Sequence, residues 1–220
     1  MATPYLQLRQ EEVPSTQDLA RAELDRLPVV VIAQRQSAGR GRTGAGWVSA
    51  PRALAVSVAF NLSDGGRRPW SLIAGLAAVR ALGGASLKWP NDIVIGEPYL
   101  KVGGILVELS AGVVVAGLGV NLWWPRAPDG VGALHDEDPG PKLHAGIAGV
   151  WAAEFIDLIG EEPWPIDEYR KVCVTLGRDI TWDPDGSGRA VDLTEDGELV
   201  VRDGTGLHTI TSGAIRHLRG

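Results

Sequence analysis

A glycine-rich stretch between two strand-like segments places the strongest constraint on the fold of this chain. Residues 36–47 read QSAGRGRTGAGW, and they follow an apolar run at 29–34. Three of the glycines have the spacing of the dinucleotide-binding fingerprint, but such a site needs a helix that opens directly on the loop. Here Pro51 and a second apolar run at 53–60 follow, which predicts another strand. The loop therefore joins two strands, and we reject a Rossmann-type site.

The composition of this loop predicts an anion-binding site. Its glycines let the backbone approach a ligand closely, and successive free N–H groups in such a turn can surround an anion. Arg40 and Arg42 add planar cations that suit phosphate or carboxylate groups. A plain surface loop is the alternative, and it is less favoured because such loops rarely need two arginines among three glycines.

Length and charge limit the classes of protein that fit. A chain of 220 residues can form one large domain, or one domain with a small appendage. The net charge of −6 argues against a general nucleic-acid binder. The single cysteine, Cys173, excludes a disulfide framework and a cysteine metal cluster. The start of the chain lacks a signal-sequence pattern and no apolar run reaches membrane length, so we expect a cytoplasmic protein without membrane contact.

The segment that begins at Ser15 has the pattern of a helix start. Ser15 and Asp18 have capping-box spacing, and apolar residues follow at helical intervals. Taken alone, Ser15 and Thr16 are best explained as a helix cap. The alternative is that their hydroxyl groups and the free N–H groups of the helix start face a polar ligand.

Two segments later in the chain carry polar residues in unusual places. Lys101 interrupts an apolar run at 99–109, where a lysine is rarely buried without a partner. Gly103 and Gly104 follow it and indicate a bulge or a close backbone approach. We therefore favour an anionic ligand for Lys101. The Trp-Pro-Asn-Asp corner at 89–92 fits a structural turn and a functional site equally well.

The remaining pattern predicts an α+β fold with a mixed sheet. A short strand is expected at 5–8, helices are expected at 70–82, 142–160 and 165–176, and a strand pair is expected at 99–109 and 113–122. Gly117 and Gly119 leave the end of the second strand of this pair open to a neighbour, and Asn121 presents amide donors and acceptors. From residue 177 onward, short strands broken by Asp-Gly pairs predict a small all-β appendage of about five strands.

With these segments in view, the chain resembles the biotin protein ligases, also called biotin–[acetyl-CoA-carboxylase] ligases. GRGRTGAGW, KWPND, KVGGILVE and GLGVN occur in the order of that family, and Ser15-Thr16-Gln17 is similar to its Ser-Thr-Asn motif. Thr43 and Ala45 stand where basic residues are common, and Gln17 replaces the usual asparagine. No segment ahead of Ser15 resembles the winged-helix DNA-binding domain of the bifunctional members, so we expect no repressor role.

The resemblance implies a fold and a reaction. Residues 1–176 would form a class II synthetase-like catalytic domain with a mixed sheet, and 177–220 an SH3-like β-barrel. Biotin carboxylate would attack the α-phosphate of MgATP to give biotinyl-5′-AMP and pyrophosphate. A lysine of a biotin carboxyl carrier protein would then take the biotinyl group and release AMP. The expected partners are thus biotin, ATP with Mg²⁺ and the carrier protein, with no DNA and no membrane, for a monomer or weak homodimer.

The resemblance also implies which residues form the site. Lys101 and Arg42 are the expected catalytic residues, because cations must screen the two anions that react. The residues expected to bind biotin are Ser15, Thr16, Gln17, Gln36, Gly39, Arg40, Arg42, Lys101, Gly103 and Gly104. Those expected to bind ATP or the adenylate are Arg40, Arg42, Trp47, Lys88, Asn91, Asp92, Lys101 and Asn121.

Several roles and functions stay open at this point. Asp92 either helps to hold Mg²⁺ or orients the acceptor amine, Lys88 is a second phosphate ligand or a solvated residue, and Trp47 stacks on adenine or covers the pocket. A lipoate or octanoate protein ligase or transferase would share the catalytic fold. A non-enzymatic ligand-binding module would explain the glycine-rich loop, but not Lys101 within a sheet segment.

Overall fold

The protein is described here from a computed structural model, which covers residues 3–44, 46–62, 68–140, 143–184, 186–211, 213 and 215–217. Its elements are β1 (Leu6–Val13), α1 (Thr16–Ala22), β2 (Val29–Gln36), the 3₁₀ turn η1 (Arg42–Gly44), β3 (Arg52–Asn61), α2 (Trp70–Leu82), β4 (Ser86–Lys88), β5 (Asp92–Ile95), β6 (Leu100–Ser110), β7 (Val113–Trp123), α3 (Leu143–Ile159), α4 (Ile166–Val172), β8 (Asp179–Trp182), β9 (Gly186–Leu193), β10 (Leu199–Asp203), β11 (Gly206–Ile210) and β12 (Ile215–His217).

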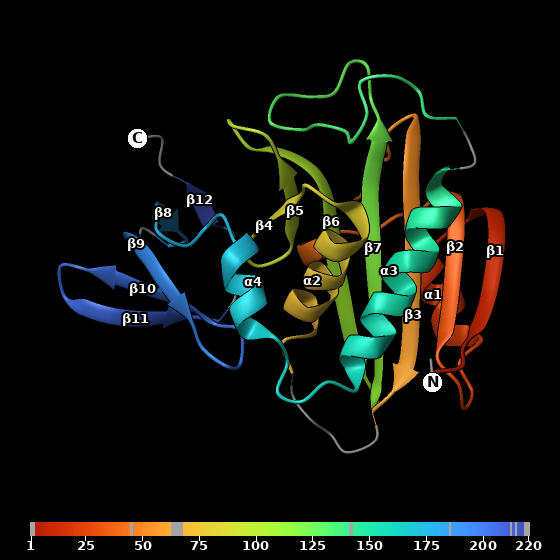
Figure 1. Ribbon diagram of the computed structural model, residues 1–220, viewed down its shortest axis with the longest axis horizontal. Helices are drawn as coiled ribbons and strands as arrows, with labels where there is room; N and C mark the ends of the chain where they lie inside the picture. Colours follow the sequence, from red (N-terminus) through yellow and green to blue (C-terminus); the bar gives the residue numbers. More distant parts are fainter. Residues whose placement is uncertain are drawn as a thin grey trace.

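The larger of two sheets is mixed, as predicted, and has helices on both faces (Figure 1). Its seven strands lie in the order β1-β2-β3-β7-β6-β5-β4. Strands β1 and β2 are parallel, and the other neighbours are antiparallel. Helices α2 and α3 pack on the face that lies in front in Figure 1, and α1 packs on the other face. The glycine-rich loop joins β2 to β3, which pair directly, so the exclusion of a Rossmann-type connection is confirmed.

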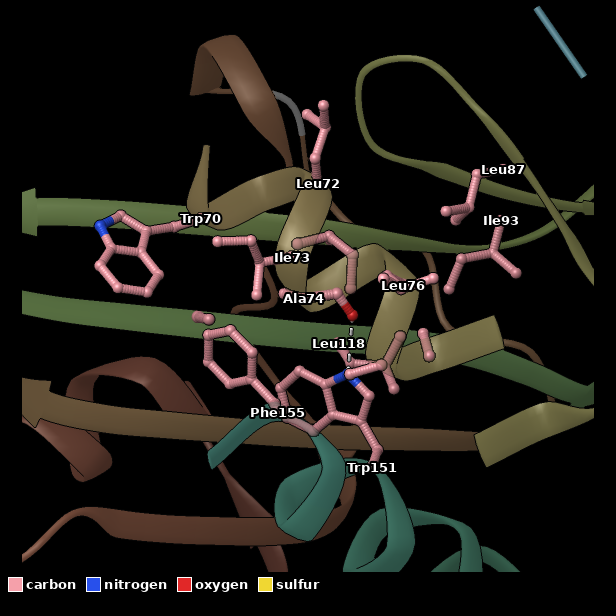
Figure 2. Packing of buried hydrophobic residues seen from close by; sticks show 14 of the residues in the cluster. Trp70, Leu72, Ile73, Ala74, Leu76, Leu87, Ile93, Leu118, Trp151 and Phe155 are labelled. Carbon is pink, nitrogen blue, oxygen red and sulfur yellow. Dashed lines mark hydrogen bonds between the residues drawn. The ribbon is translucent and has the colours of Figure 1, made fainter. Parts of the chain in front are cut away.

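The main core lies between the sheet and helices α2 and α3. Trp151 stacks on Phe155 with ring centroids 5.6 Å apart, and its Nε1 donates a hydrogen bond of 3.0 Å to the Ala74 carbonyl oxygen (Figure 2). Helix α2 is apolar on nearly all sides because α3 covers the side that the sheet leaves open. Its bounds, Trp70–Leu82, are those that the sequence predicts.

The C-terminal sheet is antiparallel, with its five strands in the order β11-β10-β9-β8-β12. The predicted small all-β unit is thus present, at the left in Figure 1. Two hydrogen bonds connect the 89–92 corner to the segment 175–217: Trp89 N donates to Thr175 Oγ1 at 3.0 Å, and Trp89 Nε1 donates to the Gly197 carbonyl oxygen at 2.9 Å.

The ends of some elements differ from those that the sequence pattern indicates. Strand β1 extends to Val13, well beyond the short strand expected near 5–8, because it pairs with the whole length of β2. Helix α4 ends at Val172 rather than 176, because Val174 N donates to the Leu87 carbonyl oxygen and the chain runs beside β4. Within the described part of the chain, no helix combines the length and the apolar character that a bilayer crossing requires.

Candidate functional site

A cavity of about 320 Å³ lies on the α1 side of the large sheet. Its wall combines the start of α1, the glycine-rich loop, the 89–92 corner and the middle of β6 and β7, which are distant in the sequence. The predicted site residues on this wall are Thr16, Gln17, Gln36, Arg40, Arg42, Trp47, Lys88, Asn91, Asp92, Lys101 and Gly104.

Four predicted site residues do not line the cavity. Ser15 caps α1 by accepting a hydrogen bond from Asp18 N. The Gly39 carbonyl oxygen accepts from Trp47 N, and Gly103 lies so close to β7 that a Cβ there would be 2.7 Å from the Gly119 carbonyl oxygen. Asn121 is buried and donates to the Gly132 carbonyl oxygen at 3.1 Å. These residues shape the segments that form the wall.

One end of the cavity has buried, uncharged polar groups. Gln36 Oε1 accepts hydrogen bonds from Thr16 N at 2.8 Å and from Thr16 Oγ1 at 2.9 Å. Thr16 Oγ1 also lies 2.8 Å from Ser57 Oγ on β3. Gln17 Nε2 donates to the Leu106 carbonyl oxygen at 3.2 Å. Amide and hydroxyl groups that are buried and held in this way can recognise a neutral ligand through directed hydrogen bonds.

Glycines on the strands make room for the Trp47 ring. A Cβ at Gly119 would lie 2.9 Å from Trp47 Cε2, and one at Gly104 would lie 3.6 Å from Trp47 Cζ3. A third glycine, Gly117, faces Gln17, where a Cβ would lie 3.2 Å from its Cδ. The prediction that Gly117 and Gly119 leave β7 open to a neighbour is confirmed.

The other end of the cavity carries cations beside the 89–92 corner. Lys101 Nζ lies 2.5 Å from Asp92 Oδ1, so the anion that this lysine meets here is a carboxylate of the chain itself, and the anionic ligand that the sequence favours stays a prediction. Arg42 Nη1 donates to Asn91 Oδ1 at 3.1 Å, while Asn91 Nδ2 donates to the Ile105 carbonyl oxygen at 2.9 Å. Arg42 and Lys101 thus contact two adjacent residues of the corner, Asn91 and Asp92. From these positions both cations can face a phosphate or a carboxylate.

Arg40 has a different environment from Arg42. Its two terminal nitrogens donate to the two carboxylate oxygens of Asp18, both at 2.7 Å. Its Nη2 also donates to Glu108 Oε1 at 3.1 Å. The hydrogen bonds from Arg40 lower the pKa of the Asp18 carboxyl below its usual value. The guanidinium therefore joins α1 and β6 at the edge of the cavity.

The residues of the wall that were not among the predicted site residues include Ser57, Gly213 and Ile215. Ser57 contributes its hydroxyl, and Gly213 and Ile215 reach the cavity from the C-terminal segment. Ser57 is the one hydroxyl in the apolar run 53–60, which is a signal that the sequence does contain. Gly213 and Ile215 have no comparable signal, because their position depends on how the two sheets pack.

The described residues include no group of three or more histidine, cysteine, aspartate or glutamate side chains that could hold a metal ion. Asp92 is the one carboxylate among the described residues of the cavity wall. Magnesium bound with a nucleotide commonly takes one or two protein carboxylates, with phosphates and water as the other ligands. Asp92 therefore fits a magnesium ion that arrives with nucleotide phosphates.

Comparison with known proteins agrees with this arrangement. Residues 11–122 match the family described as "Biotin/lipoate A/B protein ligase family", and residues 175–218 match the "Biotin protein ligase C terminal domain". The chain belongs to the biotin/lipoate A/B protein ligase family. The first match includes the start of α1, the glycine-rich loop, the 89–92 corner and Lys101, and so spans most of the cavity wall.

Individual relatives extend the likeness to nearly the whole chain. The biotin–[acetyl-CoA-carboxylase] ligase of Mycobacterium tuberculosis is 31% identical, over 87% of this chain and 79% of its own. A biotin protein ligase from Aquifex aeolicus, solved with biotin and ATP, shares the fold with a TM-score of 0.81, at 24% identity over 97% of this chain and 99% of its own. One from Leishmania major, solved with biotinyl-5-AMP, gives a TM-score of 0.61 at 25% identity, over 94% of this chain and 98% of its own.

Proposed function

We propose that this chain is an ATP-dependent biotin–[biotin carboxyl-carrier protein] ligase that acts on the carrier protein of acetyl-CoA carboxylase or a related carboxylase. The observation that carries the proposal is the division of one cavity into a buried neutral polar end and a cationic end. Biotin has the same division, because its ureido ring is neutral and its chain ends in a carboxylate. The family membership and the biotin ligases among the relatives support the same reaction.

The neutral end would hold the ureido ring. Thr16, Gln17, Gln36 and Ser57 offer hydroxyl and amide groups, which can pair with the N–H and carbonyl groups of the ring. Thr16, Gln17 and Ser57 are almost fully buried, and hydrogen bonds within the chain hold their polar groups in fixed positions for directed contacts with the ring. The Trp47 ring, beside Gly119, would cover the bound ligand or stack on the adenine.

The cationic end would serve the first reaction step. A carboxylate oxygen of biotin attacks the α-phosphorus of ATP, the bond to the β-phosphate oxygen breaks, and pyrophosphate leaves. Lys101 and Arg42 would lower the repulsion between the two anions and stabilise the charge that develops on the α-phosphate oxygens. Lys88 and Asn91 lie on the same wall and would contact the phosphates or the adenine.

The second step would use the same wall. The amine of the acceptor lysine attacks the biotinyl carbonyl carbon, and the bond to the AMP oxygen breaks. Asp92, which already holds the Lys101 ammonium, is suited to orient a second amine. The alternative role of Asp92 is to hold the Mg²⁺ that arrives with ATP, where the ion would supply positive charge to the phosphates. Asp92→Asn separates these roles: a raised Mg²⁺ requirement for adenylation indicates the metal role, and a defect confined to transfer indicates the amine role.

ATP–pyrophosphate exchange with biotin, lipoate and octanoate tests the proposal. Exchange that depends on biotin supports it, and exchange that depends on lipoate or octanoate favours the other activity that the family name includes. Binding of biotin without exchange indicates a ligand-binding module. Labelling of a purified biotin carboxyl carrier domain then tests the acceptor.

Four further expectations belong to this proposal. We propose a boundary between the catalytic and C-terminal domains at residues 176 and 177. We also propose a cytoplasmic location, a monomer or weak homodimer, and no binding to operator DNA, since the net charge is −6. Sedimentation tests the oligomeric state. A salt-sensitive, sequence-specific gel shift at submicromolar protein would contradict the DNA expectation.

A further inference from the structure

The contacts of Arg40 lead to an inference about how the cavity is covered. We propose that Arg40 is a positioning residue, which latches the glycine-rich loop to α1 and β6 through Asp18 and Glu108, and that phosphate contact falls to Arg42. The activity part of the test rests on the proposed function. The latch itself is a property of the protein without ligands.

The latch joins three segments that are distant in the sequence. Arg40 in the loop contacts Asp18 in the first turn of α1 through two parallel hydrogen bonds of 2.7 Å. It contacts Glu108 on β6 at 3.1 Å, and Arg21 Nη2 donates to the other oxygen of the same glutamate, also at 3.1 Å. Paired hydrogen bonds between a guanidinium and a carboxylate fix both distance and orientation. These hydrogen bonds therefore hold the loop against α1 and β6.

The charges of this group oppose phosphate binding by Arg40. Two guanidiniums, from Arg40 and Arg21, face two carboxylates, from Asp18 and Glu108, so the positive charge is already balanced. A phosphate that approached Arg40 would displace Asp18 and would lie beside two carboxylates, which repel it. Arg42 lies at the 89–92 corner, where its Nη1 donates to Asn91 Oδ1 and where the neighbouring cation, Lys101, pairs with the single carboxylate of Asp92.

The position of the latch connects it to the cover of the cavity. Arg40 forms an antiparallel bridge with Gly46, and Trp47 N donates to the Gly39 carbonyl oxygen at 2.9 Å. The latch thus holds the base of a short hairpin that carries Arg42 at its tip and leads into Trp47. If the latch opens, the Trp47 ring and the Arg42 guanidinium lose their fixed positions together.

Hydrogen exchange of the protein without ligands tests the latch directly. We expect the backbone N–H of Trp47, which is bonded within the hairpin, to exchange about two- to fivefold faster in Asp18→Asn and in Glu108→Gln, as is typical for loss of one partly exposed ion pair. Arg40→Gln removes both pairs and should give a larger increase. Glu168→Gln is the matched control, because it breaks a similar paired contact, with Arg80, on the opposite face of the sheet. Unchanged exchange in all three latch variants would overturn the proposal.

Retention of the adenylate separates a latch from a phosphate ligand. If Arg40 is a latch, Asp18→Asn should speed dissociation of biotinyl-5′-AMP, and the double variant Asp18→Asn/Arg40→Gln should be no worse than Arg40→Gln alone. If Arg40 binds phosphate instead, Asp18→Asn should leave retention unchanged or improved, because it frees the guanidinium; that result would refute the latch. If the unaltered protein makes no adenylate with biotin, the proposed function fails, while the exchange experiment still decides the latch.

Discussion

Replacement of Lys101 by alanine should abolish adenylation while the fold survives. The Lys101 side chain is 39% exposed and pairs with Asp92 Oδ1 at 2.5 Å. Partly exposed ion pairs of this kind contribute about 0–1 kcal/mol to the free energy of unfolding. A change of that size lowers the melting temperature of a chain of this length by no more than about 4 °C.

The expected loss of rate is much larger than the loss of stability. In the first step, the Lys101 ammonium would face the biotin carboxylate and the α-phosphate while charge moves between them. Loss of one preorganised donor to a developing anion costs about 100-fold or more in rate, or at least ~2.7 kcal/mol. Truncation therefore should lower the adenylation rate by about two orders of magnitude in a protein that is still folded.

The loss of rate is measured as single-turnover formation of biotinyl-5′-AMP, and the loss of stability is measured by thermal unfolding of the same variant. Lys171→Ala is the matched control, because it removes an exposed lysine from α4, which contributes no residue to the described cavity wall. Lys101→Arg keeps the positive charge but changes its shape, and should recover only part of the rate. A folded Lys101→Ala protein that forms adenylate at the rate of the control would refute the proposed role of this residue.

Four further predictions concern other parts of the site. Arg42→Gly should weaken retention of the adenylate more than its formation, and release of biotinyl-5′-AMP with labelling of bystander proteins measures this; a variant that makes less but releases none would contradict it. Biotin with ATP should increase the hydrogen-exchange protection of the described amides within 37–46, because Arg40 fixes only the base of the hairpin and the ligand offsets the ordering cost of the rest, roughly 1–2 kcal/mol per residue; equal protection in both states would mean that the whole loop is preformed. Trp89→Phe should lower stability by about 2 kcal/mol, seen in denaturant unfolding, because the buried Gly197 carbonyl oxygen loses its donor. Burial and nearby positive charge hold the pKa of His217 at about 4 against 6.5 for a free histidine, so stability should fall as pH drops from 6.5 toward 4, and His217→Asn should flatten that dependence.

The local sequence pattern was sufficient for elements whose tertiary contacts do not change what that pattern indicates. The apolar run at 70–82 forms α2 with the expected bounds, because a helix that is apolar on all sides must be buried wherever it packs. The glycine-rich loop joins two strands as expected, because Pro51 and the following run exclude a helix there. Strand β1 and helix α4 were misjudged at their ends, since pairing with β2 and with β4 decides where each one stops.

The sequence by itself determined which chemical groups are available to the site: the neutral polar residues near Thr16, the two arginines of the loop and a lysine within a sheet segment. These depend on residue type and short spacing, which the chain carries directly. Only the tertiary structure decided what each group meets. It placed Ser57 beside Thr16, Asp92 beside Lys101, and Asp18 and Glu108 around Arg40. Contacts between distant segments follow from strand order and packing, and a local pattern does not specify them.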